Sequence, residues 1–255
     1  MSTIQEGHVD VQIENKVATI EFGHPMGNSL PSKILKLLAQ TITETSKNKE
    51  VHAIVLKSSG EKAFCAGASF DELININDID TGLEFFSGFA LVINAIRTCG
   101  KIVIGRVHGK AVGGGVGIAA AVDYCFATKF ADIKLSELAV GIGPFVVGPA
   151  IERKIGLSTM SQLALDATEW RSASWAYKKG LYSDVFDSVE EMDKAVNTLA
   201  EKLANSNPDA LNKLKEVFWE GTEHWDIILK DRAEISGTLV LSDFTKNAIN
   251  KFKKK

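Results

Sequence analysis

Apolar and polar positions alternate near the start of the chain in a way that predicts a β-hairpin. Residues 9–11 and 17–22 carry apolar side chains at alternate positions, and the segment 14–16 between them has the composition of a turn. Pro31 then precedes apolar residues at helical spacing over 35–42, which predicts a helix that begins at this proline.

Three short continuous apolar runs follow, at residues 51–56, 102–107 and 124–128. Runs of this length without polar interruption are typical of parallel strands buried on both faces. Strands that alternate with helices predict right-handed crossovers and a mainly parallel sheet, with the ligand at the carboxyl ends of the strands.

Beyond residue 151 the pattern is helical. The segments expected to form helices are 158–167, 172–179, 189–205, 209–218 and 222–253. A helical tail that cannot close a core alone usually packs on its own domain or on a neighbouring subunit.

Composition narrows the class of protein. The balance of 45% hydrophobic and 24% charged residues is ordinary for a soluble globular enzyme, and a net charge of −3 gives no reason to expect a nucleic acid or a membrane as partner. The three cysteines match neither a metal site nor a disulfide framework, which favours a cytoplasmic setting. We expect no signal peptide in residues 1–10, no uninterrupted membrane-spanning run, and a frayed lysine-rich end at 251–255.

Two turns of glycine and alanine carry most of the chemical information. They occupy residues 63–68 and 111–117, each after an apolar run and before a segment of helical character. Small residues leave backbone N–H groups uncovered there, and such groups can stabilise a developing oxyanion. The candidate donors are the amides of Ala68 and Gly114, although a single turn of this kind more often only packs a helix against a strand.

Glu137 is the candidate for proton transfer, because a glutamate among apolar residues can be buried with a raised pKa. The alternative is a solvated loop glutamate. His108, Asp123 and Ser69 are given structural interpretations rather than roles as base or nucleophile. The phenylalanines at 85–89 are core residues by default, but their helix could form the wall of an acyl pocket.

Several motifs together resemble the crotonase superfamily, the enoyl-CoA hydratase/isomerase family, over nearly the whole chain. The segments that carry the resemblance are Val17-Ala18-Thr19-Ile20, Asn28-Ser29-Leu30, Ala63-Phe64-Cys65-Ala66-Gly67-Ala68, His108-Gly109-Lys110-Ala111-Val112-Gly113-Gly114-Gly115, Gly141 with Pro144 and Gly148, and Arg171-Ser172-Ala173 with Ala176 and Gly180-Leu181.

The resemblance implies an α/β fold, a spiral of ββα units with a helical C-terminal trimerisation region. Residues 1–195 would form the core, and 196–255 would form the oligomerisation region of a homotrimer or a dimer of trimers. The substrate would be an acyl-CoA thioester, with coenzyme A as part of the substrate and no further cofactor or metal. The resemblance gives catalytic roles to Glu137, Ala68 and Gly114, and substrate-binding positions to Ala66, Gly67, Phe70, Gly113, Gly117 and Pro144.

Departures from the family pattern determine the functional prediction. The first catalytic glutamate of hydratases would stand at position 117, where this chain has glycine, and the loop 143–147 is bulkier than usual. One glutamate can still move a proton between two carbons of an enolate, so we predict double-bond isomerisation. Hydration or dehydration and decarboxylation stay open. Gly117→Glu is expected to place a second carboxylate near Glu137 and to add or increase hydration of a short enoyl-CoA, with folding preserved if the pocket has room.

Two alternatives come from other classes of protein. Gly113, Gly115 and Gly117 form a weak dinucleotide-binding signal, with Asp132 or Glu137 as the ribose acid, but the spacing departs from that motif. A non-catalytic acyl-CoA binder or an RNA-associated scaffold is the second alternative, and the retention of Glu137 argues against it.

Overall fold

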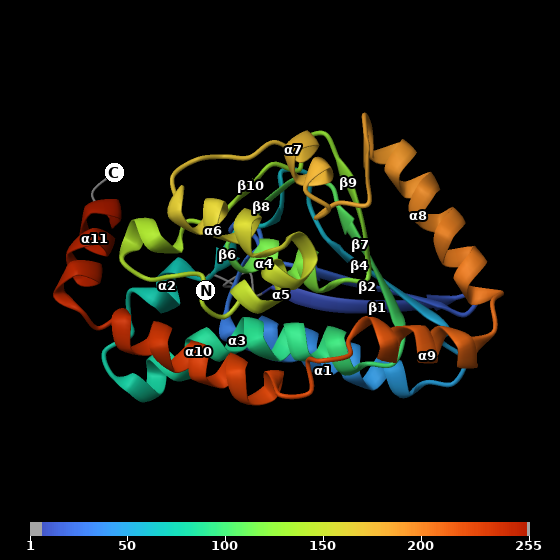
Figure 1. The fold of residues 1–255 in the computed structure, drawn as a ribbon, viewed down its shortest axis with the longest axis horizontal. Coiled ribbons are helices and arrows are strands. Elements are labelled where there is room, and N and C mark those ends of the chain that lie inside the picture. Colours follow the sequence, from blue (N-terminus) through green and yellow to red (C-terminus); the bar gives the residue numbers. More distant parts are fainter. Residues whose placement is uncertain (1–6, 254–255) are drawn as a thin grey trace, which may run out of the picture.

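A six-stranded sheet with the order β1-β2-β4-β7-β9-β11 forms the centre of the molecule in the computed structural model, which describes residues 7–253 (Figure 1). Its strands are β1 (His8–Glu14), β2 (Val17–Gly23), β4 (Ala53–Ser58), β7 (Ile102–Val107), β9 (Tyr124–Thr128) and β11 (Asp184–Phe186). β1 runs antiparallel to β2, and every other neighbouring pair is parallel. The predicted hairpin and the parallel strands are therefore confirmed.

Two smaller sheets lie beside the large one. They consist of β10 (Ile133–Lys134), β8 (Lys110–Val112) and β5 (Ala63–Cys65), and of β3 (Ser29–Leu30) paired with β6 (Gly67–Ala68). Along the chain, a strand of the large sheet is followed by a short strand of a small sheet and then by a helix. This repeat is the predicted spiral of ββα units.

Helices cover both faces of the large sheet, which explains why its central strands are continuously apolar. Figure 1 shows α1, α3 and α10 side by side, and α8 apart from them on the other side of the sheet. Val55, Ile104 and Phe126 pack against Met192 and Val196 of α8. The helices are α1 (Ser32–Lys47), α2 (Phe70–Leu73), α3 (Ile79–Thr98), α4 (Gly114–Ala121), the 3₁₀ helix η1 (Glu137–Val140), α5 (Gly148–Ile155), α6 (Leu157–Leu165), α7 (Ala173–Lys178), α8 (Val189–Ala204), α9 (Pro208–Phe218), α10 (Trp225–Leu239) and α11 (Asp243–Lys253).

The helix predicted from Pro31 is present, with Pro31 as its N-cap. The predicted helix over 222–253 is wrong in one respect, because it is divided into α10 and α11. The helix expected after the first glycine turn is only the four-residue α2. The expectations for residues 1–6 and for the last two lysines lie outside the described residues.

The C-terminal helices pack on the rest of the chain. Gly82 of α3 and Gly237 of α10 lie so close that a Cβ on either would meet the other helix's backbone at about 3.0 Å. α9 is anchored by the buried ion pair between Lys215 Nζ and Asp123 Oδ2, which are 2.6 Å apart. Asp123 also accepts the amide of Val103 at 2.8 Å, in line with its predicted structural role. The oligomerisation of this region stays a prediction.

α3 has the length and composition of a helix that could cross a membrane, contrary to the expectation of no membrane-spanning run. Half of that stretch is buried inside the fold, and the helix packs against α1 and α10. These contacts are those of a core helix in a globular domain. Three phenylalanines of this helix line the cavity described next.

Candidate active site

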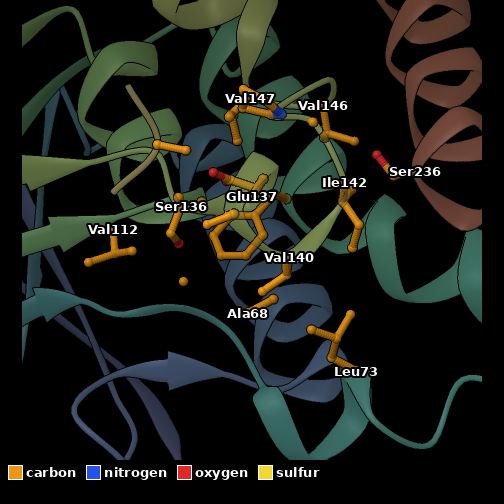
Figure 2. Close-up of a pocket in the computed structure, with 18 of the residues that line it drawn as sticks. Ala68, Leu73, Val112, Ser136, Glu137, Val140, Ile142, Val146, Val147 and Ser236 are labelled. Carbon is orange, nitrogen blue, oxygen red and sulfur yellow. The ribbon is translucent and has the colours of Figure 1, made fainter. Parts of the chain in front are cut away.

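Three successive turns of the spiral each contribute one group to a single cavity. Ala68 ends β6, Gly114 follows β8 and opens α4, and Glu137 follows β10 and opens η1. All three residues line a cavity of about 530 Å³. Figure 2 shows Glu137 in the middle of this cavity, with Val112 and Ser136 on one side, Ile142, Val146 and Ser236 on the other, and Val147 above.

The cavity is mainly apolar, and it holds most of the residues that the sequence predicted for it. Of the predicted site residues, those that line it are Ala66, Gly67, Ala68, Phe70, Gly113, Gly114, Glu137 and Pro144. Phe85, Phe86 and Phe89 of α3 form one wall, so they are not only core residues, which was their default interpretation. Among the residues that the structure describes there, Glu137 is the only carboxylate.

The Asn28 side chain fixes the first glycine turn in place. Its amide nitrogen donates to the carbonyl oxygens of Ser59 at 2.8 Å and Ala63 at 2.9 Å. The backbone amide of Ala66 donates in turn to the carbonyl of Asn28 at 3.1 Å. Ser69 caps α2 by accepting the amide of Glu72, a capping role that agrees with its structural interpretation.

The second turn needs glycine at each of positions 113, 114 and 115, for different reasons. Gly113 has a φ of +53°, and its amide donates to the carbonyl of Lys134 at 2.9 Å. A Cβ on Gly114 would lie 2.1 Å from the ring of Phe89, and one on Gly115 would lie 2.6 Å from the carbonyl oxygen of Cys65. The Gly114 amide belongs to the first helical turn, and no acceptor for it is present in residues 7–253. It is therefore available to a ligand.

Glu137 is held beside this second turn. Its Oε1 lies 2.7 Å from the position that a Cβ on Gly113 would take, and its Oε2 is buried without a hydrogen-bond partner in the described part of the chain. The backbone is fixed by the tight turn of η1, where Ile142 N donates to Glu137 O at 3.0 Å and Gly141 adopts a φ of +82°. Burial raises the pKa of the Glu137 carboxyl to about 7. This environment contradicts the alternative of a solvated loop glutamate.

Gly117 does not line the cavity, because Val147 covers it. A Cβ at position 117 would lie 2.5 Å from Cγ1 and 2.8 Å from Cβ of Val147. The pocket therefore lacks the room on which the expectation for Gly117→Glu depended. Val147 itself lines the cavity and presents a methyl-rich surface there. The bulky loop noticed in the sequence is thus the reason that this part of the cavity is apolar.

His108 and Asp132 do not line the cavity. His108 is buried and its two ring nitrogens have no partner among the described residues, while burial, with Arg106 nearby, lowers its pKa to about 4. It is neutral at physiological pH and does not line the cavity. Asp132 Oδ1 accepts the amide of Ala173 at 3.2 Å, so it is not free to act as the ribose acid of a dinucleotide site. In residues 7–253 no group of His, Cys, Asp and Glu side chains could hold a metal ion.

The raised pKa of Glu137 leads to a prediction about how the free energy of unfolding depends on pH. The unfolded carboxyl ionises near pH 4.5 and the folded one near 7, so between these values the folded protein binds more protons and loses stability as pH rises. Glu137→Gln should remove this loss. We expect the variant to be as stable as the parent at pH 4.5 and more stable at pH 8, by up to about 3 kcal/mol. Urea denaturation at the two pH values measures the difference, and an equal difference at both would contradict the buried carboxylate.

Comparison with known proteins shows the family to which the chain is related. A sequence model of the enoyl-CoA hydratase/isomerase family matches residues 12–250. The chain is 30% identical to a short-chain-enoyl-CoA hydratase of Clostridium acetobutylicum, over 96% of this chain and 94% of that protein. It is 32% identical to a peroxisomal Δ(3,5)-Δ(2,4)-dienoyl-CoA isomerase of Arabidopsis thaliana, over 72% and 70%.

The fold has close structural counterparts as well. The crystal structure of an enoyl-CoA hydratase from Bacillus halodurans superposes with a TM-score of 0.87, covering 95% of this chain and 99% of that one, at 20% identity. The chain belongs to the enoyl-CoA hydratase/isomerase family.

Proposed function

We propose that this protein is an acyl-CoA isomerase, which moves a carbon–carbon double bond in an enoyl thioester by means of Glu137. The observation that supports this most directly is that Glu137 is the only carboxylate among the described residues of the cavity. A carboxyl with a pKa of about 7 is balanced between its acid and base forms near neutral pH. It is therefore suited both to take a proton and to return it.

The reaction has two proton transfers and no net change in composition. The Glu137 carboxylate removes a proton from C2 of a 3-enoyl thioester, and the electron pair moves into the carbonyl to give an enolate. The amides of Ala68 and Gly114 hold the enolate oxygen, an arrangement in which each donor contributes about 2.7–4 kcal/mol to transition-state stabilisation. The protonated Glu137 then delivers its proton to C4, which leaves the double bond between C2 and C3.

Hydration is the second candidate, because the relative from Clostridium acetobutylicum is named a short-chain-enoyl-CoA hydratase. Addition of water benefits from a second acid or base that orients the water while the first transfers a proton. In this chain the methyl groups of Val147 lie over Gly117, where such a second carboxylate would emerge. The apolar surface there gives water no hydrogen-bond partner, which favours isomerisation over hydration.

The test is a direct comparison of the two reactions. We expect a 3-enoyl-CoA of six carbons to be converted to its conjugated 2-enoyl isomer, followed by the rise in ultraviolet absorbance of the conjugated thioester. Crotonyl-CoA, whose hydration removes this absorbance, should react at least tenfold more slowly. Faster loss of crotonyl-CoA than gain of the conjugated product would favour the hydratase, and binding without any turnover would favour the non-catalytic alternative.

The remaining parts of the proposal concern partners. The cavity would take the acyl group of an acyl-CoA thioester, and the coenzyme would enter only as part of that substrate. A homotrimer or a dimer of trimers is proposed from the family resemblance. No further cofactor is needed for the two proton transfers, since the only group that changes protonation is Glu137.

A further inference from the structure

A pair of lysines lies beside the cavity without an acidic partner. Lys110 Nζ and Lys134 Nζ each lie 4.6 Å from the centroid of the Trp170 ring. Neither ammonium group forms an ion pair within residues 7–253. Each gains attraction from the indole, but two like charges on one ring repel each other. An anion bound to both would offset this repulsion.

The strands explain why both lysines point to the same place. β8 and β10 are paired in parallel with Val112 opposite Lys134, and side chains on a strand alternate between its two faces. Lys110, Val112 and Lys134 therefore share one face of this small sheet. Val112, Lys134 and Trp170 all line the cavity that contains Glu137, and Figure 2 shows Val112 directed into it.

The acidic residues close to Lys134 and Trp170 in the sequence form no ion pair with either lysine among the described residues. Asp166 forms an ion pair with Arg171, Asp132 accepts the amide of Ala173, and Glu169 accepts the hydroxyl of Thr168. The segment between α6 and α7 that carries Trp170 is held against β10 by the backbone pairing of Arg171 with Ile133. Figure 1 shows this segment beside β8 and β10. The positive charge is thus fixed in position and left for a ligand.

The position of the lysines within the site decides which anion they suit. The amide of Gly113, next to the proposed oxyanion donor Gly114, donates to the backbone carbonyl of Lys134. A thioester carbonyl held at Gly114 would therefore lie close to this lysine. The phosphates of coenzyme A are separated from the thioester by the long pantetheine arm, whereas a carboxylate on a short acyl chain is only a few bonds away.

We propose that Lys110 and Lys134, arranged around Trp170, form a subsite for a carboxylate on the acyl group, so that the preferred substrates are CoA monothioesters of dicarboxylic acids. The inference rests on the proposed acyl-CoA function and names its substrate class. The phenylalanine wall on α3 contacts the hydrocarbon portion of the acyl group. The lysines supply charge-assisted hydrogen bonds to the carboxylate.

The experiment compares binding of two unreactive ligands of equal length, glutaryl-CoA and valeryl-CoA, by titration calorimetry. We expect the parent protein to bind glutaryl-CoA roughly ten- to hundredfold more tightly, as expected when a carboxylate gains hydrogen bonds to charged groups. Lys110→Met with Lys134→Met keeps the aliphatic stems and removes both charges. This variant should lose the preference and bind valeryl-CoA as the parent does.

Lys129→Met is the matched control, because Lys129 is an exposed lysine that lies over a different aromatic ring and pairs with Asp187. It should leave both affinities unchanged. Equal affinity of the parent for the two ligands would overturn the carboxylate subsite alone. An equal loss for both ligands and for free coenzyme A in the double variant would overturn it too, since the lysines would then hold phosphate. If the parent binds no acyl-CoA at all, the proposed function fails with it.

Discussion

Glu137→Gln is expected to lower isomerase turnover by roughly 10²- to 10⁴-fold, the range that a positioned general base contributes. The amide has nearly the same shape as the carboxyl but cannot accept the proton from C2. Acyl-CoA affinity should change little, because the apolar walls and the backbone amides are untouched. Steady-state kinetics with a 3-enoyl-CoA measure turnover, and calorimetry with a saturated acyl-CoA measures affinity.

Glu152→Gln provides the control for this variant. Glu152 is an exposed carboxylate on α5 and does not line the cavity, so its replacement should leave turnover unchanged. The pH profile adds a second readout. The parent's kcat/KM should rise with pH through about 7 as Glu137 ionises, and the residual rate of Glu137→Gln should lack this step. Turnover by Glu137→Gln close to that of the parent would show that another group moves the proton.

The second large effect is expected from a double variant, Gly117→Glu with Val147→Gly. The Cβ at 117 collides with Cγ1 and Cβ of Val147, while the Val147 Cα at 3.6 Å is in ordinary contact. Removal of the valine side chain therefore opens the space that the glutamate needs. A second carboxylate near Glu137 would raise the proton affinity of one of the two and could hold water. We expect hydration of crotonyl-CoA to increase by roughly 10²-fold or more.

The two single variants distinguish the effect of making room in the cavity from the effect of adding a carboxylate. Gly117→Glu alone should be destabilised by about 1–3 kcal/mol from overpacking, seen as a lower melting temperature, and should gain little hydration. Val147→Gly alone should lose stability through the cavity it leaves and gain no hydration. Hydration by the parent as fast as by the double variant would mean that Val147 does not limit the reaction.

Much of the fold could be predicted because its strongest signals are local. The hairpin at β1 and β2, the helix after Pro31 and the buried strands each follow from periodicity within a few residues. The strands of the small sheets have two or three residues each and leave no periodic signal, so the sequence predicts the glycine turns directly after the strands of the large sheet. The ββα repeat came from the resemblance rather than from periodicity.

In the candidate site, too, the residues in local motifs could be predicted, and the contacts that form only in the folded chain could not. Ala68, Gly114 and Glu137 could be named because each lies in a short motif. The contact between Gly117 and Val147 could not be derived, since the bulky loop was visible but its partner lies thirty positions earlier and the two meet only in the folded chain. The lysines around Trp170 are likewise brought together by strand pairing and a loop contact. No local pattern marks them.

The most direct test of the account follows the protons themselves. A 3-enoyl-CoA is incubated with the protein in D₂O, and the products are followed by NMR from the earliest times. Proton movement by Glu137 alone predicts a 2-enoyl-CoA product, deuterium confined to C2 and C4, and no 3-hydroxyacyl-CoA while the isomers equilibrate. Formation of 3-hydroxyacyl-CoA as fast as the 2-enoyl isomer appears would contradict the account, because it would require an activated water that the surface of Val147 does not provide.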